Sequence, residues 1–155
     1  MADLSLYQKR REELSRRYLQ TTPLQPVYTG GVDHLALISS NLEATIHFYT
    51  QVIGMRVTRI VQNRDEPTST HIFLDMGGGN LLAFFDFPEK GPARTVRGVG
   101  SMHHVALKAQ PDRLRKIIST LNERNISYSL HGSPESGSLY VHDTDDILVE
   151  VTARD

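Results

Sequence analysis

Three side chains that commonly bind metal ions occupy related positions in this sequence. His34 and His104 each begin a short apolar segment, His-Leu-Ala-Leu in one case and His-Val-Ala-Leu in the other. Glu150 is a carboxylate inside the apolar run 147–151, where an unpaired charge would be costly to desolvate. Two neutral imidazoles and one carboxylate on one face make a ligand set for Fe(II) or a similar divalent cation, with open positions for substrate and oxygen. We therefore predict that His34, His104 and Glu150 bind a divalent metal ion.

The strands that carry these residues must point them the same way. Side chains alternate between the two faces of a strand, so His34 faces away from Leu35 and His104 faces away from Val105. Glu150 likewise lies on the face opposite its valine neighbours. Because the two histidines occupy equivalent places in a repeated unit, we expect all three side chains to face one concave surface.

The repeated unit is a strand, a helix and three further strands. One copy covers residues 32–87 and the other covers residues 101–153. The pattern of apolar residues predicts strands at 32–39, 55–62, 70–76, 80–87, 101–108, 126–132, 138–143 and 147–153. We therefore predict an α+β fold in which two tandem βαβββ units form a curved, eight-stranded mixed sheet with a metal-binding cleft.

Local signals place the helix of each unit. Asn41 or Ser40 is a suitable N-cap for the first helix, and Gly54 stands where the residue after a helix is often glycine. Pro111 is suited to the first turn of the second helix. Ahead of the units, the charged segment 8–20 predicts an additional N-terminal helix, which the prolines and glycines of 21–31 end. We expect a helix and linker at 1–30 and one domain at 31–155, with units at 31–90 and 100–155.

Composition excludes several classes of protein. The chain has 155 residues, of which 39% are hydrophobic, and a net charge of −1. These values argue against a disordered chain and against a nucleic-acid binder. No apolar run approaches the roughly 18 residues of a membrane-spanning helix, and the charged start is unlike a signal peptide. The absence of cysteine excludes thiolate metal sites and is consistent with a reducing compartment. We expect a cytoplasmic protein with no nucleic-acid or membrane partner.

Several segments together resemble a known superfamily. The openings DHLAL and HHVAL, the helix end FYTQVIGM and the closing ILVEV resemble the vicinal oxygen chelate superfamily over about residues 31–153. That superfamily includes glyoxalase I, methylmalonyl-CoA epimerase, fosfomycin-modifying enzymes, bleomycin-binding proteins and extradiol dioxygenases. The resemblance implies the same three ligands, His34, His104 and Glu150. It also implies a bound divalent metal ion, with Fe(II) favoured and Mn(II), Zn(II) or Ni(II) as alternatives.

Within that superfamily, the second unit is most similar to the extradiol dioxygenases. His131, Tyr140 and Glu150 follow the spacing of their signature. The resemblance implies an enzyme that cleaves a catechol-like substrate with O₂. The same resemblance implies that His131 acts as general acid or base and that Tyr140 donates a hydrogen bond to a substrate oxygen. Thr144 and Asp146 replace the proline and glycine of the signature, and Asn80 stands where dioxygenases have a histidine that helps to handle oxygen and protons.

Two other functions remain open at this point. The first is a non-oxidative glyoxalase, epimerase or thiol-transferase type of enzyme, that is, a lyase, isomerase or transferase that uses another divalent metal. Its four-ligand forms are disfavoured because Ala83 stands where they carry a carboxylate. The second is a metal-free resistance protein that binds a small molecule, a class whose members lack the three predicted ligands.

The resemblance also implies an assembly. Sites of this superfamily often lie at a dimer interface, so we expect a homodimer that binds a small aromatic or vicinal-oxygen substrate. If units are exchanged between chains, His34 comes from a different subunit than His104 and Glu150. The N-terminal helix is a candidate for additional dimer contacts.

Overall fold

The chain forms two compact units, Met1–Gly31 and Val32–Asp155. The computed structural model describes residues 4–19, 29–90, 96 and 98–153. In the first unit, helix α1 (Leu4–Tyr18) confirms the predicted N-terminal helix, and none of its residues is buried. The linker prolines Pro23 and Pro26 lie outside the described residues. None of the described helices combines the length and the apolar character needed to cross a membrane.

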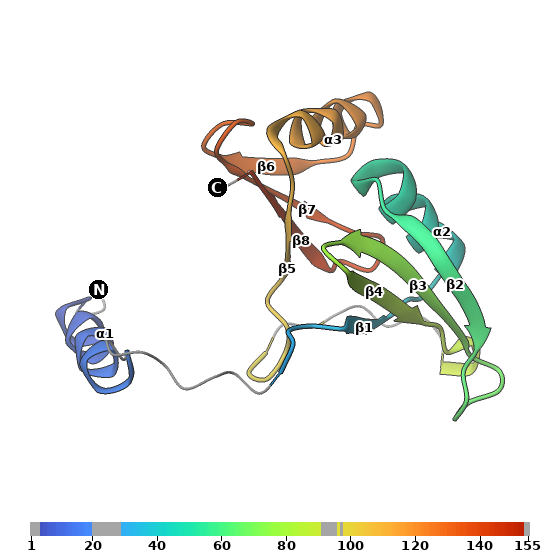
Figure 1. Ribbon diagram of the computed structural model, residues 1–155, viewed down its shortest axis with the longest axis horizontal. Coiled ribbons are helices and arrows are strands. Elements are labelled where there is room, and N and C mark those ends of the chain that lie inside the picture. Colours follow the sequence, from blue (N-terminus) through green and yellow to red (C-terminus); the bar gives the residue numbers. More distant parts are fainter. Residues whose placement is uncertain (1–3, 20–28, 91–95, 97, 154–155) are drawn as a thin grey trace. The chain divides into compact units, whose positions relative to one another are not determined.

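The second unit contains the predicted pair of βαβββ repeats (Figure 1). The first repeat comprises β1 (His34–Ile38), α2 (Leu42–Phe48), the π-helical turn η1 (Tyr49–Ile53), β2 (Arg56–Gln62), β3 (Thr70–Gly77) and β4 (Asn80–Phe85), followed by the short 3₁₀ helix η2 (Pro88–Lys90). The second repeat comprises β5 (Val105–Lys108), α3 (Pro111–Glu123), β6 (Tyr128–His131), β7 (Ser138–His142) and β8 (Leu148–Thr152). The α+β class predicted from the sequence is therefore confirmed.

The eight strands form two four-stranded sheets with equivalent topology. Their orders are β1-β4-β3-β2 and β5-β8-β7-β6. In each sheet the first strand of the repeat pairs in parallel with the last strand, and the remaining pairs are antiparallel. This topology places the residues that begin a repeat beside those that end it.

The predicted helix signals are observed, with one difference in geometry. The Asn41 side chain caps α2 by accepting a hydrogen bond from the Ala44 amide, and Pro111 occupies the first turn of α3. Gly54 ends η1 with a φ of 90°, a conformation that glycine adopts without steric cost. The last turn of the expected first helix is π-helical rather than α-helical.

Apolar side chains of both repeats make one continuous core. The residues facing it alternate along the strands with residues that face outward, as expected for sheets covered by helices on one side. The largest fully buried members are Tyr49, Phe84, Ile72, Leu74, Leu82, Leu114, Leu121, Leu139, Val141, Val149 and Val151.

A buried polar contact joins the two repeats within this core. The Tyr49 hydroxyl donates a hydrogen bond of 2.8 Å to Oδ2 of Asp143, while Oδ1 of Asp143 accepts from the amides of Asp145 and Ile147. Burial, reinforced by Asp143, raises the pKa of Tyr49 well above its usual value, so the phenol stays protonated and remains a donor. Burial also raises the pKa of Asp143. The carboxylate therefore depends on these donors to compensate for lost hydration.

Removing the Tyr49 hydroxyl should measure this contact. We expect Tyr49→Phe to lower the free energy of unfolding by about 1–3 kcal/mol, because a buried carboxylate oxygen loses its donor. Denaturant unfolding provides the measurement. Tyr128→Phe is the matched control, since the Tyr128 hydroxyl makes an exposed hydrogen bond to Asn122 and its loss should cost less than about 0.5 kcal/mol.

The cost of Tyr49→Phe should depend on pH. The lost hydrogen bond favours ionised Asp143, so its removal raises the folded-state pKa of that carboxyl further. As the pH falls from neutral, the folded Tyr49→Phe protein then binds more protons than the folded wild type. The difference in the free energy of unfolding between wild type and Tyr49→Phe therefore becomes smaller. A difference that stays constant from pH 7 to pH 4 would contradict this assignment.

Candidate metal centre

Glu150 lies on the outward face of the second sheet. It is opposite Ala106 of β5 and Tyr140 of β7 in the strand register, and its neighbours Val149 and Val151 enter the core. Although it faces outward, only 8% of the residue is exposed. A carboxylate this far from water needs compensating polar partners.

His104 is in direct contact with that carboxylate. It immediately precedes β5, rather than lying within the predicted strand 101–108, and its Nε2 is 3.0 Å from Oε2 of Glu150. Its Nδ1 lies 2.7 Å from Nδ1 of His103. An imidazole nitrogen and a carboxylate oxygen in contact are a donor pair that divalent cations such as Fe(II), Mn(II) and Zn(II) accept.

Two further predicted residues adjoin this pair. The Tyr140 ring lies 6.2 Å from the His104 ring and 5.4 Å from the His131 ring, measured between centroids, and is nearly perpendicular to both. His131, the last residue of β6, shares its face with Ser129, which pairs with Tyr140. The structure thus brings together four of the five predicted site residues on one face of the second sheet.

His34, the fifth residue, has different neighbours. It begins β1 in the first sheet, its Nδ1 lies 2.7 Å from Oδ1 of Asp33, and its ring packs 5.9 Å from the Phe73 ring. Among the residues that the structure describes, no three His, Asp or Glu side chains are grouped so that they could hold a metal ion. Within the described part of one chain, His104 and Glu150 therefore form a pair, and His34 does not join them.

Asn80 is engaged in a turn. It is the first residue of β4 and pairs with Gly77, and its Nδ2 donates to the carbonyls of Gly77 and Gly78. The three glycines of this turn all have positive φ. The side chain at the position where dioxygenases have a histidine thus stabilises the turn between β3 and β4.

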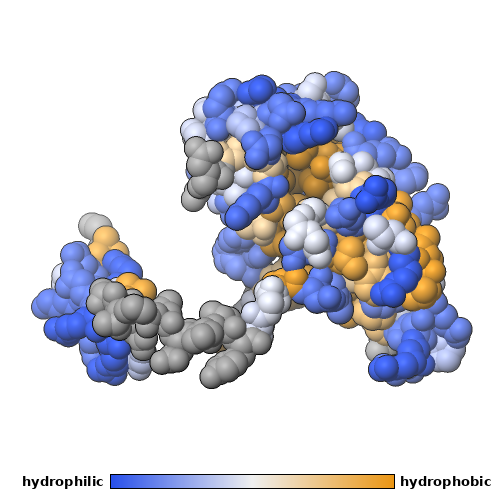
Figure 2. Space-filling view, in the orientation of Figure 1, coloured by the Kyte–Doolittle hydropathy of each residue, from blue (hydrophilic) through white to orange (hydrophobic). Residues whose placement is uncertain are grey.

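Two cavities lie near the boundary between the repeats. The larger, of about 650 Å³, is lined by Leu107 and Val151, which face away from Ala106 and Glu150. It therefore lies on the opposite side of the second sheet from the candidate metal centre. A smaller cavity of about 300 Å³ is lined by β1, by 146–148 and by His103, the neighbour of His104. Figure 2 shows apolar side chains within a hollow between the two repeats.

The outward face of the first sheet carries a cluster of rings that the sequence analysis did not identify. In this aromatic patch, formed by His34, His71, Phe73 and Phe85, the His71 ring stacks 3.7 Å from Phe85 and 4.0 Å from Phe73. Within the described part of the chain, the buried Nε2 of His71 has no hydrogen-bond partner. Burial, followed by the charge of Arg59, lowers the pKa of His71, so this ring is neutral at pH 7. The signal for this patch in the sequence is the alternation of His71 and Phe73, which places both side chains on one face of the strand.

The chain belongs to the Glyoxalase/Bleomycin resistance protein/Dioxygenase superfamily, which it matches over residues 31–151. The resemblance noted in the sequence is therefore confirmed at the level of the family. This superfamily places its chemistry on paired βαβββ units of the kind described above, and one such scaffold hosts several reactions.

Individual relatives are distant. MhqA and MhqE of Bacillus subtilis (strain 168), both provisionally named ring-cleaving dioxygenases, are 27% identical over 50% of this chain and 26% identical over 63% of it. The chain spans only 25% and 35% of their lengths.

Solved structures share the fold. A glyoxylase/bleomycin resistance protein/dioxygenase domain from Frankia sp. EAN1pec has a TM-score of 0.71 at 16% identity, over 82% of this chain and 99% of that one. A mutant of the Listeria monocytogenes fosfomycin resistance protein FosX, solved in complex with Mn(II), has a TM-score of 0.63 at 17% identity, over 82% of this chain and 94% of that one.

The role of Glu150 can be tested without knowing the reaction. We expect Glu150→Ala to weaken Mn(II) binding at least about tenfold, since even the outer partners of a metal site contribute 10–100-fold to affinity. Titration calorimetry measures the affinity and circular dichroism checks the fold. Glu135→Ala is the control, because Glu135 is an exposed partner of Arg115. Equal Mn(II) affinity in Glu150→Ala and wild type would remove Glu150 from the ligand set.

Proposed function

We propose that this protein is a metal-dependent enzyme that acts on a catechol-like substrate, as an extradiol-type ring-cleaving dioxygenase that uses Fe(II). The observation that carries the proposal is the grouping on the second sheet: Glu150 in contact with His104, and Tyr140 between His104 and His131. This grouping combines a buried carboxylate with imidazole and phenol groups. The dioxygenase names of MhqA and MhqE agree with it.

Each residue of the grouping has a chemical task in this proposal. His104 and Glu150, together with His34, would hold the divalent cation, which when bound supplies a Lewis acid and a template for the two substrate oxygens and O₂. The Tyr140 hydroxyl donates a hydrogen bond to a substrate oxygen. The His131 imidazole nitrogen accepts a proton from the substrate hydroxyl and later returns it, as a general base and then a general acid.

We further propose that the site is shared between two chains. Catalytic metal centres commonly use three protein ligands, whereas the described residues of one chain contain no group of three such side chains. The outward face of β1, which carries His34, also carries Ile38, whose exposed fraction is 62%. A second chain seated on this face would cover the Ile38 side chain. In a homodimer with exchanged units, His34 of one chain meets His104 and Glu150 of the other.

A non-oxidative metal enzyme of the glyoxalase, epimerase or thiol-transferase type is the second candidate. The observation that favours it is Asn80, whose side chain is bound to the β3–β4 turn. This strand therefore offers no imidazole to assist with oxygen and protons. Such an enzyme would use Mn(II), Zn(II) or Ni(II) and would not consume O₂.

Metal analysis and oxygen uptake separate the two candidates. After anaerobic purification, we expect the protein to retain a divalent cation and, once loaded with Fe(II), to consume O₂ with at least one member of a catechol panel. The expected product absorbs in the visible range, because ring cleavage next to the hydroxyls leaves a conjugated chromophore. Tight metal binding without oxygen uptake on any catechol would favour the non-oxidative enzyme.

Subunit complementation tests the shared site. His34→Ala and Glu150→Ala should each lose high-affinity Mn(II) binding. When equal amounts are refolded together, about one quarter of the wild-type sites should return, because half the dimers are mixed and each contains one intact site of two. Mn(II) titration provides the count. No recovery, with mixed dimers shown to form by mass spectrometry, would place all three ligands in one chain.

A further inference from the structure

Strand β2 contains an irregularity that changes the direction of one arginine. Val57 pairs with Leu74 and Arg59 pairs with Phe73, so the register shifts at Thr58. The Thr58 hydroxyl donates to the Phe73 carbonyl within this shift. Without the extra residue, Arg59 would lie on the core side with Val57, because residues two apart share a face. The bulge instead directs Arg59 to the outward face, a known effect of such insertions.

On that face the Arg59 guanidinium stacks on the aromatic patch. Its central carbon lies 3.9 Å from the centroid of the Phe73 ring, a distance that permits a cation–π interaction. Phe73 is only 4% exposed, yet it lies outside the core cluster. Its burial arises on the outward face, from the side chains that pack over it there. The stack holds the planar guanidinium in one orientation while its N–H groups remain able to donate.

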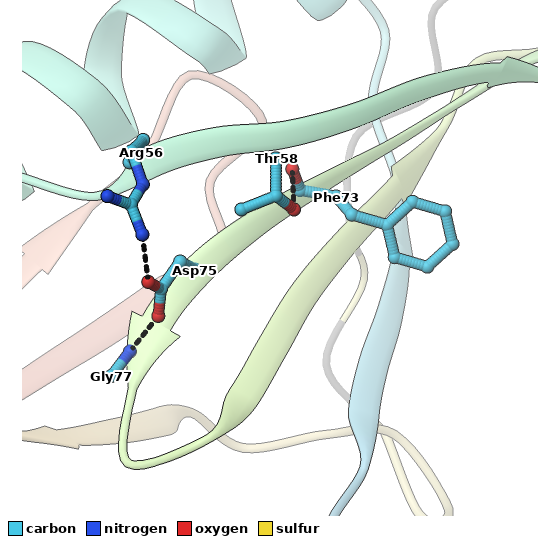
Figure 3. A network of polar contacts seen from close by, with 5 residues as sticks. All are labelled: Arg56, Thr58, Phe73, Asp75 and Gly77. Atoms are coloured by element: carbon cyan, nitrogen blue, oxygen red, sulfur yellow. Dashed lines mark hydrogen bonds and ion pairs between the residues drawn. The ribbon is translucent and has the colours of Figure 1, made fainter.

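No described carboxylate pairs with Arg59, whereas the nearby Arg56 has one. Arg56, on the same strand, forms an ion pair of 3.0 Å with Asp75, and Asp75 also accepts from the Gly77 amide. Figure 3 shows this pair, with the Phe73 ring projecting away from it. Among the described residues, no carboxylate is paired with Arg59. His71, which packs against the same ring, is neutral at pH 7 because burial and Arg59 lower its pKa.

We propose that Arg59 is a specificity-determining residue that binds an anionic substituent, a carboxylate above all, on an aromatic substrate held by the patch. The guanidinium of Arg59, which is exposed, presents paired donors that match a carboxylate in geometry and charge. The Arg59 charge, unpaired among the described residues, supplies the attraction, and the exposed parts of the His34, His71 and Phe85 rings supply a surface for an aromatic ring.

Arg59 lies close to His34, the predicted metal ligand on the first sheet. Arg59 lies 3.9 Å from the Phe73 centroid, and the His34 ring lies 5.9 Å from the same point. The guanidinium carbon is therefore at most about 10 Å from the His34 ring. One substituted benzene ring can span that separation, with its vicinal oxygens near His34 and its carboxylate at Arg59. This inference rests on the proposed function and deepens it, by naming the class of substrate as aromatic acids.

Binding measurements test the role of Arg59 apart from turnover. Mn(II)-loaded protein is titrated calorimetrically, without O₂, with 3,4-dihydroxybenzoate and with neutral 4-methylcatechol. We expect wild type to prefer the carboxylate at least about tenfold, as one charged hydrogen-bonded contact implies. Arg59→Gln should abolish that preference and leave 4-methylcatechol binding within about twofold of wild type. An unchanged preference in Arg59→Gln would overturn the proposal.

Arg56→Gln is the matched control, because Arg56 is on the same strand but already paired with Asp75. It should keep the wild-type preference. Arg59→Lys keeps the charge without the planar fork and should retain only part of it. A drop in the binding of both catechols, or a change in the dimer dissociation constant, would make Arg59 a structural or interface residue and overturn the proposal.

Failure of the proposed function has a separate signature. The metal-free protein is titrated with benzoate and with benzyl alcohol. A benzoate preference that Arg59→Gln abolishes would support the anion site, even if no catechol binds the Mn(II)-loaded protein. The failure of every catechol to bind would overturn only the ring-cleavage proposal. The absence of a benzoate preference in the wild type, together with equal binding of the two catechols, would overturn the inference about Arg59.

Discussion

The carboxylate of Glu150 is removed from water in a strand whose neighbouring residues enter the core, and this burial sets a requirement that the surrounding fold must meet. A buried charge persists only when partners replace its hydration. The parallel pairing of β5 with β8 brings the residues that open the second repeat beside Glu150, so that His104 contacts it. Tyr140 lies directly across the register from Glu150 on β7. The topology of the repeat thereby brings His104, Tyr140 and Glu150 together on one face of the second sheet.

The same alternation separates two environments in both sheets. One face of each strand enters the shared core, where the buried Tyr49–Asp143 contact joins the repeats. The other face carries the polar and aromatic groups, with His104 and Glu150 on the second sheet and the aromatic patch on the first. Because only every second residue faces outward, a single inserted residue is enough to move a side chain from one environment to the other. The bulge at Thr58 does this for Arg59.

Membership of the superfamily defines the scaffold and leaves the reaction to the site. The relatives named as dioxygenases share about a quarter of their residues with this chain over the aligned segments, and the chain spans 25% and 35% of their lengths. Under these conditions the chemistry has to be argued from individual residues. His131 and Tyr140 support ring cleavage, whereas Asn80, held in the β3–β4 turn, lacks the imidazole of the dioxygenase pattern. These residues are the points at which the two candidate functions differ.

The sequence alone predicted four features of this protein. They are the duplicated βαβββ order, the N-cap at Asn41, the start of α3 at Pro111 and the outward direction of Glu150. They depend on periodicity and on local backbone preferences, which short segments carry by themselves. Tertiary structure decided which side chains meet. It brought His104 into contact with Glu150, gave His34 separate surroundings, and stacked Arg59 and His71 on Phe73. Strand pairing and the position of a bulge depend on which segments meet in space, and a one-residue change in register reverses the faces without altering the pattern of residue types.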